Sequence, residues 1–173
     1  MRVLIAYATR HGATAGIASR IAETLEMSGH DAVAIPVDVG TFDAVVVGGA
    51  AYMFHWLKPA VHFVVRHREA LTARPVWLFS SGPLGTELVD DRGRDVLVTS
   101  RPQEFDELTE LVHARGERVF FGAFDPSAAP VGLAERTMRL MPAARTTIPS
   151  GDFRDWRAID AWAREIAEVL DSL

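Results

Sequence analysis

An uninterrupted apolar segment near the start of the chain, Val3-Leu4-Ile5-Ala6-Tyr7, constrains the fold most. Apolar segments without polar alternation are typical of strands that are buried on both faces of a parallel sheet. Apolar residues then recur at helical spacing at Ile17, Ile21 and Leu25, and Ser28-Gly29 is a signal for the end of a helix. A strand, a short loop and an amphipathic helix in this order predict the first unit of an α/β domain.

The same alternation continues along the chain. Further strands are expected at 31–37, 44–47, 76–79 and 117–122, and helices at 59–69, 104–114 and 156–170. Alternating strands and helices predict a parallel sheet with right-handed crossovers and helices on both faces. Five strands in a single domain of 173 residues favour the doubly wound order 2-1-3-4-5. Asp152 and Asp155 are expected to cap the last helix, and Trp156 is expected to pack in the core.

The loop after the first strand carries a candidate ligand site. The segment Thr9-Arg10-His11-Gly12-Ala13-Thr14 places hydroxyls and a glycine just before a helix, whose first N–H groups have no acceptor within the helix. Helix N-termini bind anions, so this segment predicts a phosphate cradle. The alternative is an ordinary strand-to-helix turn with a threonine cap. His11 either contacts the phosphate or is a solvated loop histidine.

Two further loops are expected beside this one, because doubly wound sheets bind ligands beyond the carboxyl ends of the strands at the switch point. Residues 48–56 combine small residues with aromatic and sulfur-containing ones, and residues 80–85 offer backbone amides and exposed hydroxyls. Tyr52 or Met53 is the candidate to stack on a planar ring, whereas Trp56 is expected to anchor the core. The three loops together predict a site for a flat, phosphorylated aromatic ligand.

Several other classes of site are excluded. The only lysine is Lys58, so the chain has no Walker A motif, and its glycines do not form a dinucleotide fingerprint. It also lacks a Gly-x-Ser-x-Gly elbow and a His-Glu-x-x-His helix. His62 and His67 lie about 140° apart around a helix and do not share a metal-binding face, so no metal is expected. Because cysteine is absent, any redox chemistry must come from a bound organic cofactor.

The net charge and the hydropathy of the chain limit the classes of partner that it can bind. A net charge of -5 argues against nucleic-acid binding, which needs a basic surface. The charge is also too mild for a dedicated acidic electron carrier. No apolar stretch approaches the roughly 20 residues of a membrane span, and 3–8 is too short for a signal sequence. We therefore expect a cytoplasmic protein.

Four segments, taken in their order along the chain, resemble the flavodoxin-like FMN proteins, and more narrowly the branch that includes menaquinone-dependent protoporphyrinogen IX dehydrogenase. These segments are 7–14, 49–58, 79–85 and 151–156. The resemblance covers residues 1 to about 122 and the last helix. It implies a flavodoxin-like doubly wound five-stranded fold with FMN as the cofactor. It also implies that the phosphate is held by Thr9, Arg10, His11, Gly12, Ala13 and Thr14, and that the isoalloxazine is flanked by Ala50, Ala51, Tyr52, Met53, Ser80, Ser81, Gly82, Pro83, Leu84 and Gly85.

The second loop departs from the pattern of one-electron flavodoxins. Those proteins commonly have a glycine there, whose peptide turns toward the flavin and stabilises the semiquinone, whereas no glycine lies between Ala50 and Trp56. This favours two-electron chemistry, and the resemblance implies a hydrophobic, protoporphyrinogen-like donor with a quinone acceptor. The alternatives are a non-enzymatic electron-transfer protein that docks on a reductase, and a module for another phosphorylated ligand. No catalytic side chain is predicted.

Residues 123–150 resemble the family least. The segment contains four prolines and is too long for a simple connection between a strand and a helix. On a helical wheel, one side is apolar and the other charged, and the apolar side is formed by Leu133, Ala134, Thr137, Met138, Leu140 and Met141. The interpretations are a lid over the flavin, a face for an apolar substrate or a membrane surface, and a surface helix packed on its own core.

Overall fold

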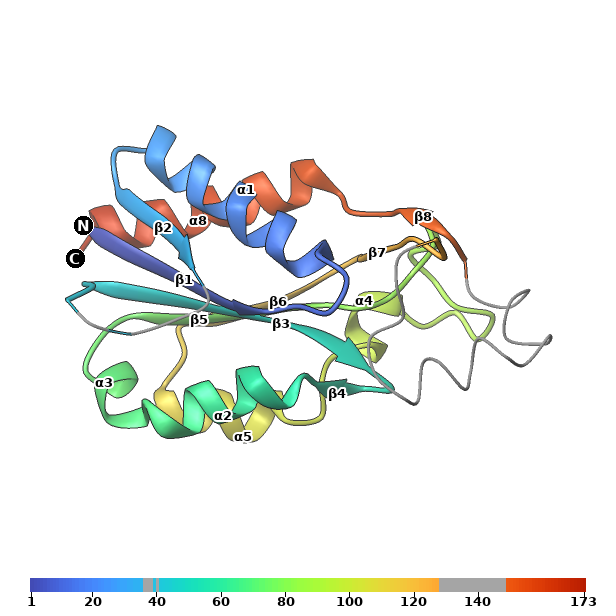
Figure 1. The fold of residues 1–173 in the computed structure, drawn as a ribbon, viewed down its shortest axis with the longest axis horizontal. Helices are drawn as coiled ribbons and strands as arrows, with labels where there is room; N and C mark the ends of the chain where they lie inside the picture. Colours follow the sequence, from blue (N-terminus) through green and yellow to red (C-terminus); the bar gives the residue numbers. More distant parts are fainter. Residues whose placement is uncertain (36–38, 40, 128–148) are drawn as a thin grey trace.

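The computed structural model describes residues 1–35, 39, 41–127 and 149–173. A central parallel sheet carries helices on both faces (Figure 1). Its strands lie in the order β2-β1-β3-β5-β6, which is the predicted order 2-1-3-4-5 once the short β4 is set aside. These strands are β1 (Arg2–Ala8), β2 (Asp31–Ile35), β3 (Ala44–Tyr52), β5 (Val76–Ser81) and β6 (Gly116–Phe120).

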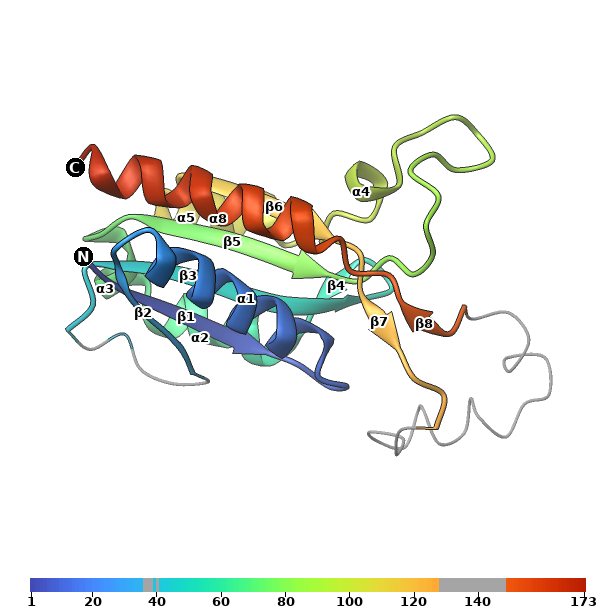
Figure 2. The ribbon, with the colours of Figure 1, turned by 90° about the horizontal axis from the view of Figure 1, so that it is seen from above.

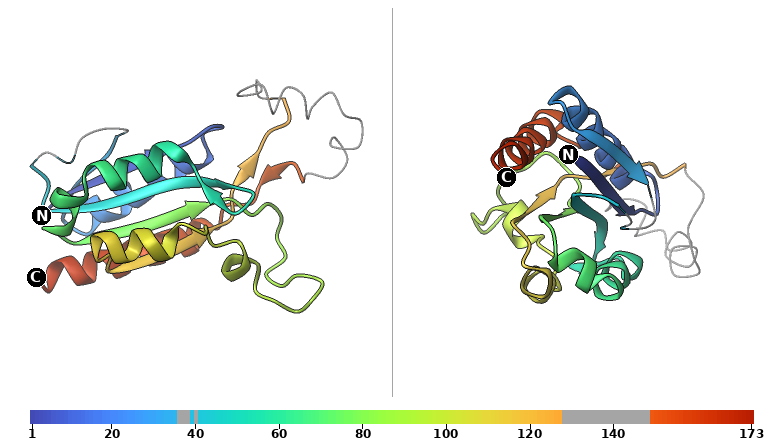
Figure 3. Two further views of the ribbon diagram at one scale, coloured as in Figure 1. Left: turned by 90° about the horizontal axis from the view of Figure 1, so that it is seen from below. Right: turned by 90° about the vertical axis from the view of Figure 1, so that its left-hand side faces the viewer.

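Two helical layers bury the two faces of this sheet. Helices α1 (Ala13–Met27) and α8 (Trp156–Asp171) cover one face, and α2 (Lys58–Arg66), α3 (Arg68–Thr72) and α5 (Phe105–Val112) cover the other (Figures 1 and 3). Alternate residues of β1 point to the two layers. Ile5 packs in the cluster with α1 and α8, and Leu4 packs in the cluster with α2 and α5. Both are fully buried, which confirms the prediction from the apolar segment.

Strands β3 and β5 run further than the sequence pattern predicts. Gly48 pairs with Phe79, Gly49 with Ser80, and Ala50 with Ser81, so the first parts of both predicted loops belong to the sheet. Glycine and serine are poor strand formers, and the local pattern therefore ends at Val47 and Phe79. Pairing with neighbouring strands overrides this preference.

The described helices deviate from prediction in two places, and one of them is the short helix α4 (Val96–Thr99), which the sequence pattern did not predict. The single helix expected at 59–69 is divided, because α2 ends at Arg66 and α3 begins at Arg68. The first helix is capped at its carboxyl end by Ser28, as predicted. The predicted helix at 104–114 corresponds to α5, and the last helix is α8.

The start of α8 confirms one of two predicted caps. The Asp155 carboxylate accepts hydrogen bonds from the N–H groups of Arg157 (3.0 Å) and Ala158 (3.1 Å). Asp152 does not cap the helix; it lies in β8 (Gly151–Asp152) and binds Arg154. Trp156 is also not a core residue, because it is 38% exposed and lies under the Arg154 guanidinium.

A two-stranded ribbon projects beyond the carboxyl end of the sheet. It is formed by β7 (Ala123–Phe124) and β8, which pair antiparallel at the two ends of the segment 123–150 (Figure 2). The residues of the predicted apolar helix face, 133–141, lie outside the described residues. The chain also leaves the sheet after β5 in a long excursion that carries α4 (Val96–Thr99). Among the described helices, none is both long and apolar enough to cross a bilayer.

Candidate functional site

The loop between β1 and α1 forms an open cradle of backbone amides. Gly12 is the N-cap of α1 and has a left-handed conformation (φ 84°), which favours glycine. The first bond within the helix runs from the Gly16 N–H to the Gly12 carbonyl (3.0 Å), so the amides of residues 13–15 have no acceptor in the helix. No side chain caps this helix, and the Thr9 hydroxyl instead accepts the Gly12 N–H (3.0 Å). The alternative of a threonine-capped turn is therefore wrong.

Three of the hydroxyls expected in the site, those of Thr14, Ser80 and Ser81, are buried in the structure. The side chains of Thr14 and Ser81 are hydrogen-bonded to each other at 2.8 Å, and both residues are buried. Ser80 is also fully buried, and its Oγ has no hydrogen-bond partner among the described residues. The expectation of exposed hydroxyls at Ser80 and Ser81 is therefore wrong, because both residues belong to the sheet. The Thr14–Ser81 bond fixes the start of α1 against the end of β5.

The second loop is a tight β-hairpin. Tyr52 in β3 pairs with His55 in β4 (His55–Trp56), and the turn between them consists of Met53 (φ 50°) and Phe54 (φ 65°). Two successive left-handed residues are typical of a type I′ turn, which usually contains asparagine and glycine. Met53 is 88% exposed, Phe54 53% and Tyr52 42%. The hairpin therefore presents an apolar tip, and the sequence carries no turn signal that would have predicted it.

Trp56 behaves differently from the exposed tip. Its ring is buried, its Nε1 donates to the Gly49 carbonyl (3.0 Å), and it meets the Phe105 ring edge to face at 5.2 Å. These contacts confirm the prediction that Trp56 anchors the core. Tyr52 lies at the site instead, with the Arg10 guanidinium 4.8 Å from its ring centroid.

The third loop, 82–85, joins the other two. The Gly82 N–H donates to the Phe120 carbonyl (3.3 Å), and the Gly122 N–H donates to the Pro83 carbonyl (2.9 Å). A Cβ placed on Gly82 would lie 3.2 Å from the Ala51 side chain, so the second and third loops are in contact. The predicted convergence of three loops is therefore present. Arg10 of the cradle contacts Tyr52 of the hairpin, and the hairpin contacts the third loop at Gly82. Ser81, the last residue of β5 before the third loop, is bonded to Thr14 in the first turn of α1.

A carboxylate that the sequence did not single out holds the hairpin. Glu104, at the start of α5, accepts a hydrogen bond from the Trp56 N–H (3.0 Å) and binds His55 Nδ1 (2.9 Å). Burial alone would raise the pKa of Glu104, but its bonds to the Trp56 N–H and the His55 ring together hold that pKa below its usual value. In the sequence, Glu104 is only an acidic residue near a helix start.

A second unpredicted contact ties the ribbon to the cradle. The Arg154 guanidinium binds both oxygens of Asp152 (2.7 and 2.6 Å), and its Nη1 lies 3.4 Å from the Ala13 carbonyl. The hydrogen bond from Arg154 lowers the pKa of Asp152, which stays ionised and paired. The Arg154 guanidinium also lies over the Trp156 ring, 4.4 Å from its centroid. The segment before α8 is thus attached to the first turn of α1.

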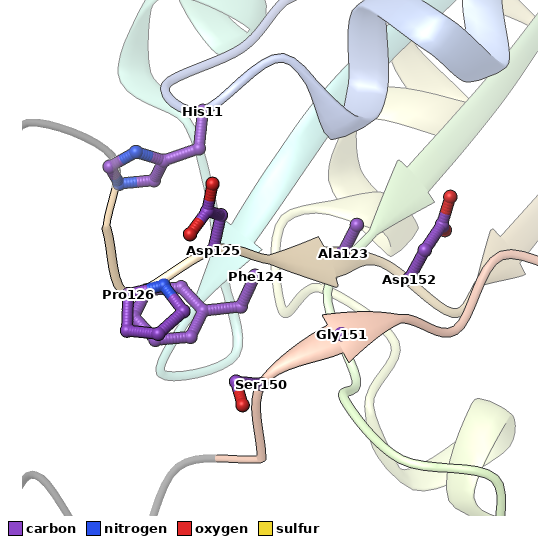
Figure 4. A pocket seen from close by; sticks show the side chains of 8 residues that line it. All are labelled: His11, Ala123, Phe124, Asp125, Pro126, Ser150, Gly151 and Asp152. Atoms are coloured by element: carbon purple, nitrogen blue, oxygen red, sulfur yellow. The ribbon is translucent and has the colours of Figure 1, made fainter.

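A shallow pocket lies between the cradle and this ribbon (Figure 4). Its volume is about 420 Å³, and the His11 ring meets the Phe124 ring edge to face across it at 6.3 Å. His11 is therefore in contact with the ribbon. The described residues include no group of three or more histidines, cysteines or acids that could hold a metal. The pocket is lined by His11, Ala123, Phe124, Asp125, Pro126, Ser150, Gly151 and Asp152.

This arrangement suits a planar ligand with a phosphate tail. The cradle offers amides without helical acceptors, and the space around Gly12 is open, since a Cβ there would meet nothing within 4 Å. The cationic Arg10 lies in the same loop, and the aromatic hairpin stands beside it. The residues present therefore fit a phosphorylated aromatic cofactor.

Several solved structures share the fold of this chain. No curated protein sequence matches the chain. The fold is similar to a cysteine-to-serine mutant of flavodoxin from Pseudomonas aeruginosa, with 15% identity, 99% of each chain covered and a TM-score of 0.60. It is also similar to a flavodoxin from the domain Archaea, with 15% identity, 99% of each chain covered and a TM-score of 0.58. Rubredoxin oxygen:oxidoreductase from the anaerobe Desulfovibrio gigas gives 12% identity and a TM-score of 0.61, over 99% of this chain and 36% of that chain.

A family model described as flavodoxin domain matches residues 4–140, which is most of the chain. That match spans the cradle, the hairpin and the third loop, so all three elements of the site lie within it. The chain therefore belongs to the flavodoxin domain family, and its cofactor is FMN.

Proposed function

We propose that this protein is an FMN-dependent oxidoreductase that moves electron pairs from a hydrophobic, protoporphyrinogen-like donor to a quinone. Membership of the family establishes flavodoxin-type electron transfer as the general function. The observation that supports the hydrophobic partner is the apolar hairpin tip of Tyr52, Met53 and Phe54, which stands exposed beside the cradle. Apolar side chains exposed together at a ligand site mark a contact surface for an apolar partner.

The roles of the residues follow from their places. In this proposal the amides of residues 13–15, with Thr9, Arg10, His11 and Gly12, hold the phosphate. Ala50 to Met53 and Gly82 to Gly85 flank the isoalloxazine, and the Thr14–Ser81 bond ties the start of α1, after the cradle, to the end of β5, before Gly82. When bound, FMN supplies the hydride-accepting ring that a chain without cysteine does not itself offer.

The turn of the hairpin supports transfer of electron pairs. It contains no glycine, and the Phe54 carbonyl already accepts a hydrogen bond from the Gln103 N–H (2.9 Å). A peptide held in this way does not turn freely to stabilise a half-reduced flavin. The alternative function, a non-enzymatic electron carrier that docks on a reductase, is favoured by the similarity to solved flavodoxins.

Stepwise reduction of the purified, FMN-loaded protein distinguishes these two functions. The oxidoreductase should pass from oxidised to fully reduced flavin without a long-wavelength band, and should then be reoxidised by a water-soluble quinone. It should also oxidise a protoporphyrinogen-type donor under anaerobic conditions. Accumulation of the half-reduced band in the wild-type protein, with no turnover of the donor, would assign the chain to the electron carriers.

The phosphate assignment needs a separate binding measurement. FMN should bind more tightly than riboflavin, because each charge-assisted hydrogen bond is worth about 1.5–3 kcal/mol. Arg10→Gln should reduce the affinity for FMN more than that for riboflavin, while the exposed Arg66→Gln at the far end of α2 serves as the matched control. Equal affinity of the wild-type protein for both flavins would contradict the cradle.

A further inference from the structure

The hairpin tip adopts a conformation that its own residues do not favour. Met53 and Phe54 both have positive φ, and neither is glycine, asparagine or aspartate. Left-handed backbone is unfavourable for residues with a large side chain and persists only where the surroundings impose it. Both side chains are exposed, so packing of these two residues in the core does not impose it. The restraint must come from groups outside the turn.

Three contacts from one short segment supply that restraint. The Gln103 N–H donates to the Phe54 carbonyl at 2.9 Å, inside the turn itself. Glu104 then holds the returning strand by two atoms, through the Trp56 N–H (3.0 Å) and His55 Nδ1 (2.9 Å). We call these contacts of Gln103 and Glu104 with the hairpin the clamp.

The clamp is itself fixed to the core. Phe105, the residue after Glu104, is fully buried and packs edge to face on Trp56 at 5.2 Å. The Glu104 side chain is 26% exposed, so its hydrogen bonds are partly shielded from water. On the strand that enters the turn, Arg10 lies over the Tyr52 ring. The tip is therefore held from both sides while its side chains stay exposed.

Building on the proposed function, we propose that Gln103 and Glu104 are positioning residues that hold the hairpin tip in one conformation in both the oxidised and the reduced protein. Rotation of the peptide after Phe54 would break the Gln103 hydrogen bond and would pull the chain away from Glu104. The clamp thereby opposes the rearrangement that accompanies one-electron reduction and favours transfer in pairs. It also keeps Met53 and Phe54 presented to the apolar partner.

Hydrogen exchange tests the clamp without any donor or acceptor. Glu104→Ala should increase the exchange rates of the Trp56 and Gln103 amides about tenfold or more, because a charge-assisted bond is lost and the turn opens locally. Glu104→Gln should lie between this variant and the wild type, since its amide oxygen still accepts the Trp56 N–H. Amides in the centre of β5 should be unchanged, and Glu107→Ala, an exposed acid on the same helix, is the matched control.

A redox readout completes the test. Glu104→Ala loaded with FMN should accumulate a half-reduced flavin band that the wild type does not show. Equal exchange of the Trp56 amide in the wild type and Glu104→Ala would overturn the clamp. A wild-type protein that itself accumulates the half-reduced band would instead overturn the proposed electron-pair transfer, and the exchange comparison would still decide whether the clamp holds the tip.

Discussion

The cradle and the hairpin are two walls of one site, and they are held in opposite ways. The cradle continues directly into α1, where the buried Thr14 is bonded to the buried Ser81 beneath it. The hairpin tip is exposed, its turn is left-handed, and polar groups of a different element hold it. One wall is thus an extension of the core, and the other is an attachment to it.

Different parts of one site can therefore be held rigid by different kinds of contact. Changes beneath the cradle should alter the free energy of unfolding of the whole domain, whereas changes at the hairpin should alter only local opening. A phosphate site benefits from rigid backbone donors, because their orientation is then fixed before the ligand arrives. The side chains of the exposed hairpin can be substituted to suit a partner, because they are not part of the core.

The largest expected effect compares two phenylalanines, one in the core cluster that contains α1 and one at the hairpin tip. Phe79→Ala should lower the free energy of unfolding by about 3–5 kcal/mol, because Phe79 is fully buried against the rings of Phe120 and Trp162. Phe54→Ala, the same truncation at the exposed tip, should cost less than about 1 kcal/mol. Urea denaturation of both variants measures the difference. Similar losses would show that the hairpin is part of the core after all.

An intermediate loss of stability is expected when the polar contacts between α1 and α8 are removed. These two helices form the layer that supports the cradle. Hydrogen bonds from Arg20 (2.6 and 2.7 Å) and from the Thr24 hydroxyl (3.1 Å) hold the pKa of Asp160 below its ordinary value of 3.8. A folded-state pKa that is lowered contributes stability above the unfolded pKa and loses it as the pH falls through the folded pKa. Asp160→Asn should therefore unfold at a lower temperature than the wild type at pH 7.

The pH dependence of that difference is the sharper measurement. Thermal unfolding of the wild type and Asp160→Asn from pH 7 to pH 3 should show the gap shrinking below about pH 4, as Asp160 of the wild type becomes protonated. Glu23→Gln removes the other acid near Arg20, at 3.4 Å on the exposed surface, and should change little. A gap that stays constant down to pH 3 would exclude the Asp160 charge as its cause.

The smallest expected effect tests the strain in the hairpin. Met53→Asn should stabilise the protein by less than about 1 kcal/mol, because asparagine tolerates left-handed backbone better than methionine and this side chain is largely exposed. Met27→Asn is the matched control. Met27 is also exposed but ends a helix, where asparagine should be slightly destabilising. If urea denaturation shows that both variants lose the same free energy of unfolding, the turn is not strained.

The layers of the fold and the order of its strands follow from local sequence patterns, and the site at the switch point is predicted from them. Apolar segments such as Val3 to Tyr7 are buried on both faces because no polar residue interrupts them, and helical spacing then places α1 and α8 on the sheet. Asp155 was predictable as a cap because capping acts between residues two or three apart. Such local patterns are complete within a few residues of sequence.

The contacts that hold the site join segments that are far apart in the sequence. Thr14 and Ser81 are 67 residues apart, and Glu104 is 48 residues from Trp56, so no local pattern links these partners. The ends of β3 and β5 became strands through pairing with neighbours, which buried Ser80 and Ser81 and removed two expected donors from the surface. Hydrogen bonds between distant segments depend on which side chains the folded sheet and helices bring within about 3 Å of each other. That distance is set by the packing of the whole domain, and for this reason local sequence patterns did not reveal the clamp or the contact of Arg154 with the Ala13 carbonyl, 141 residues away.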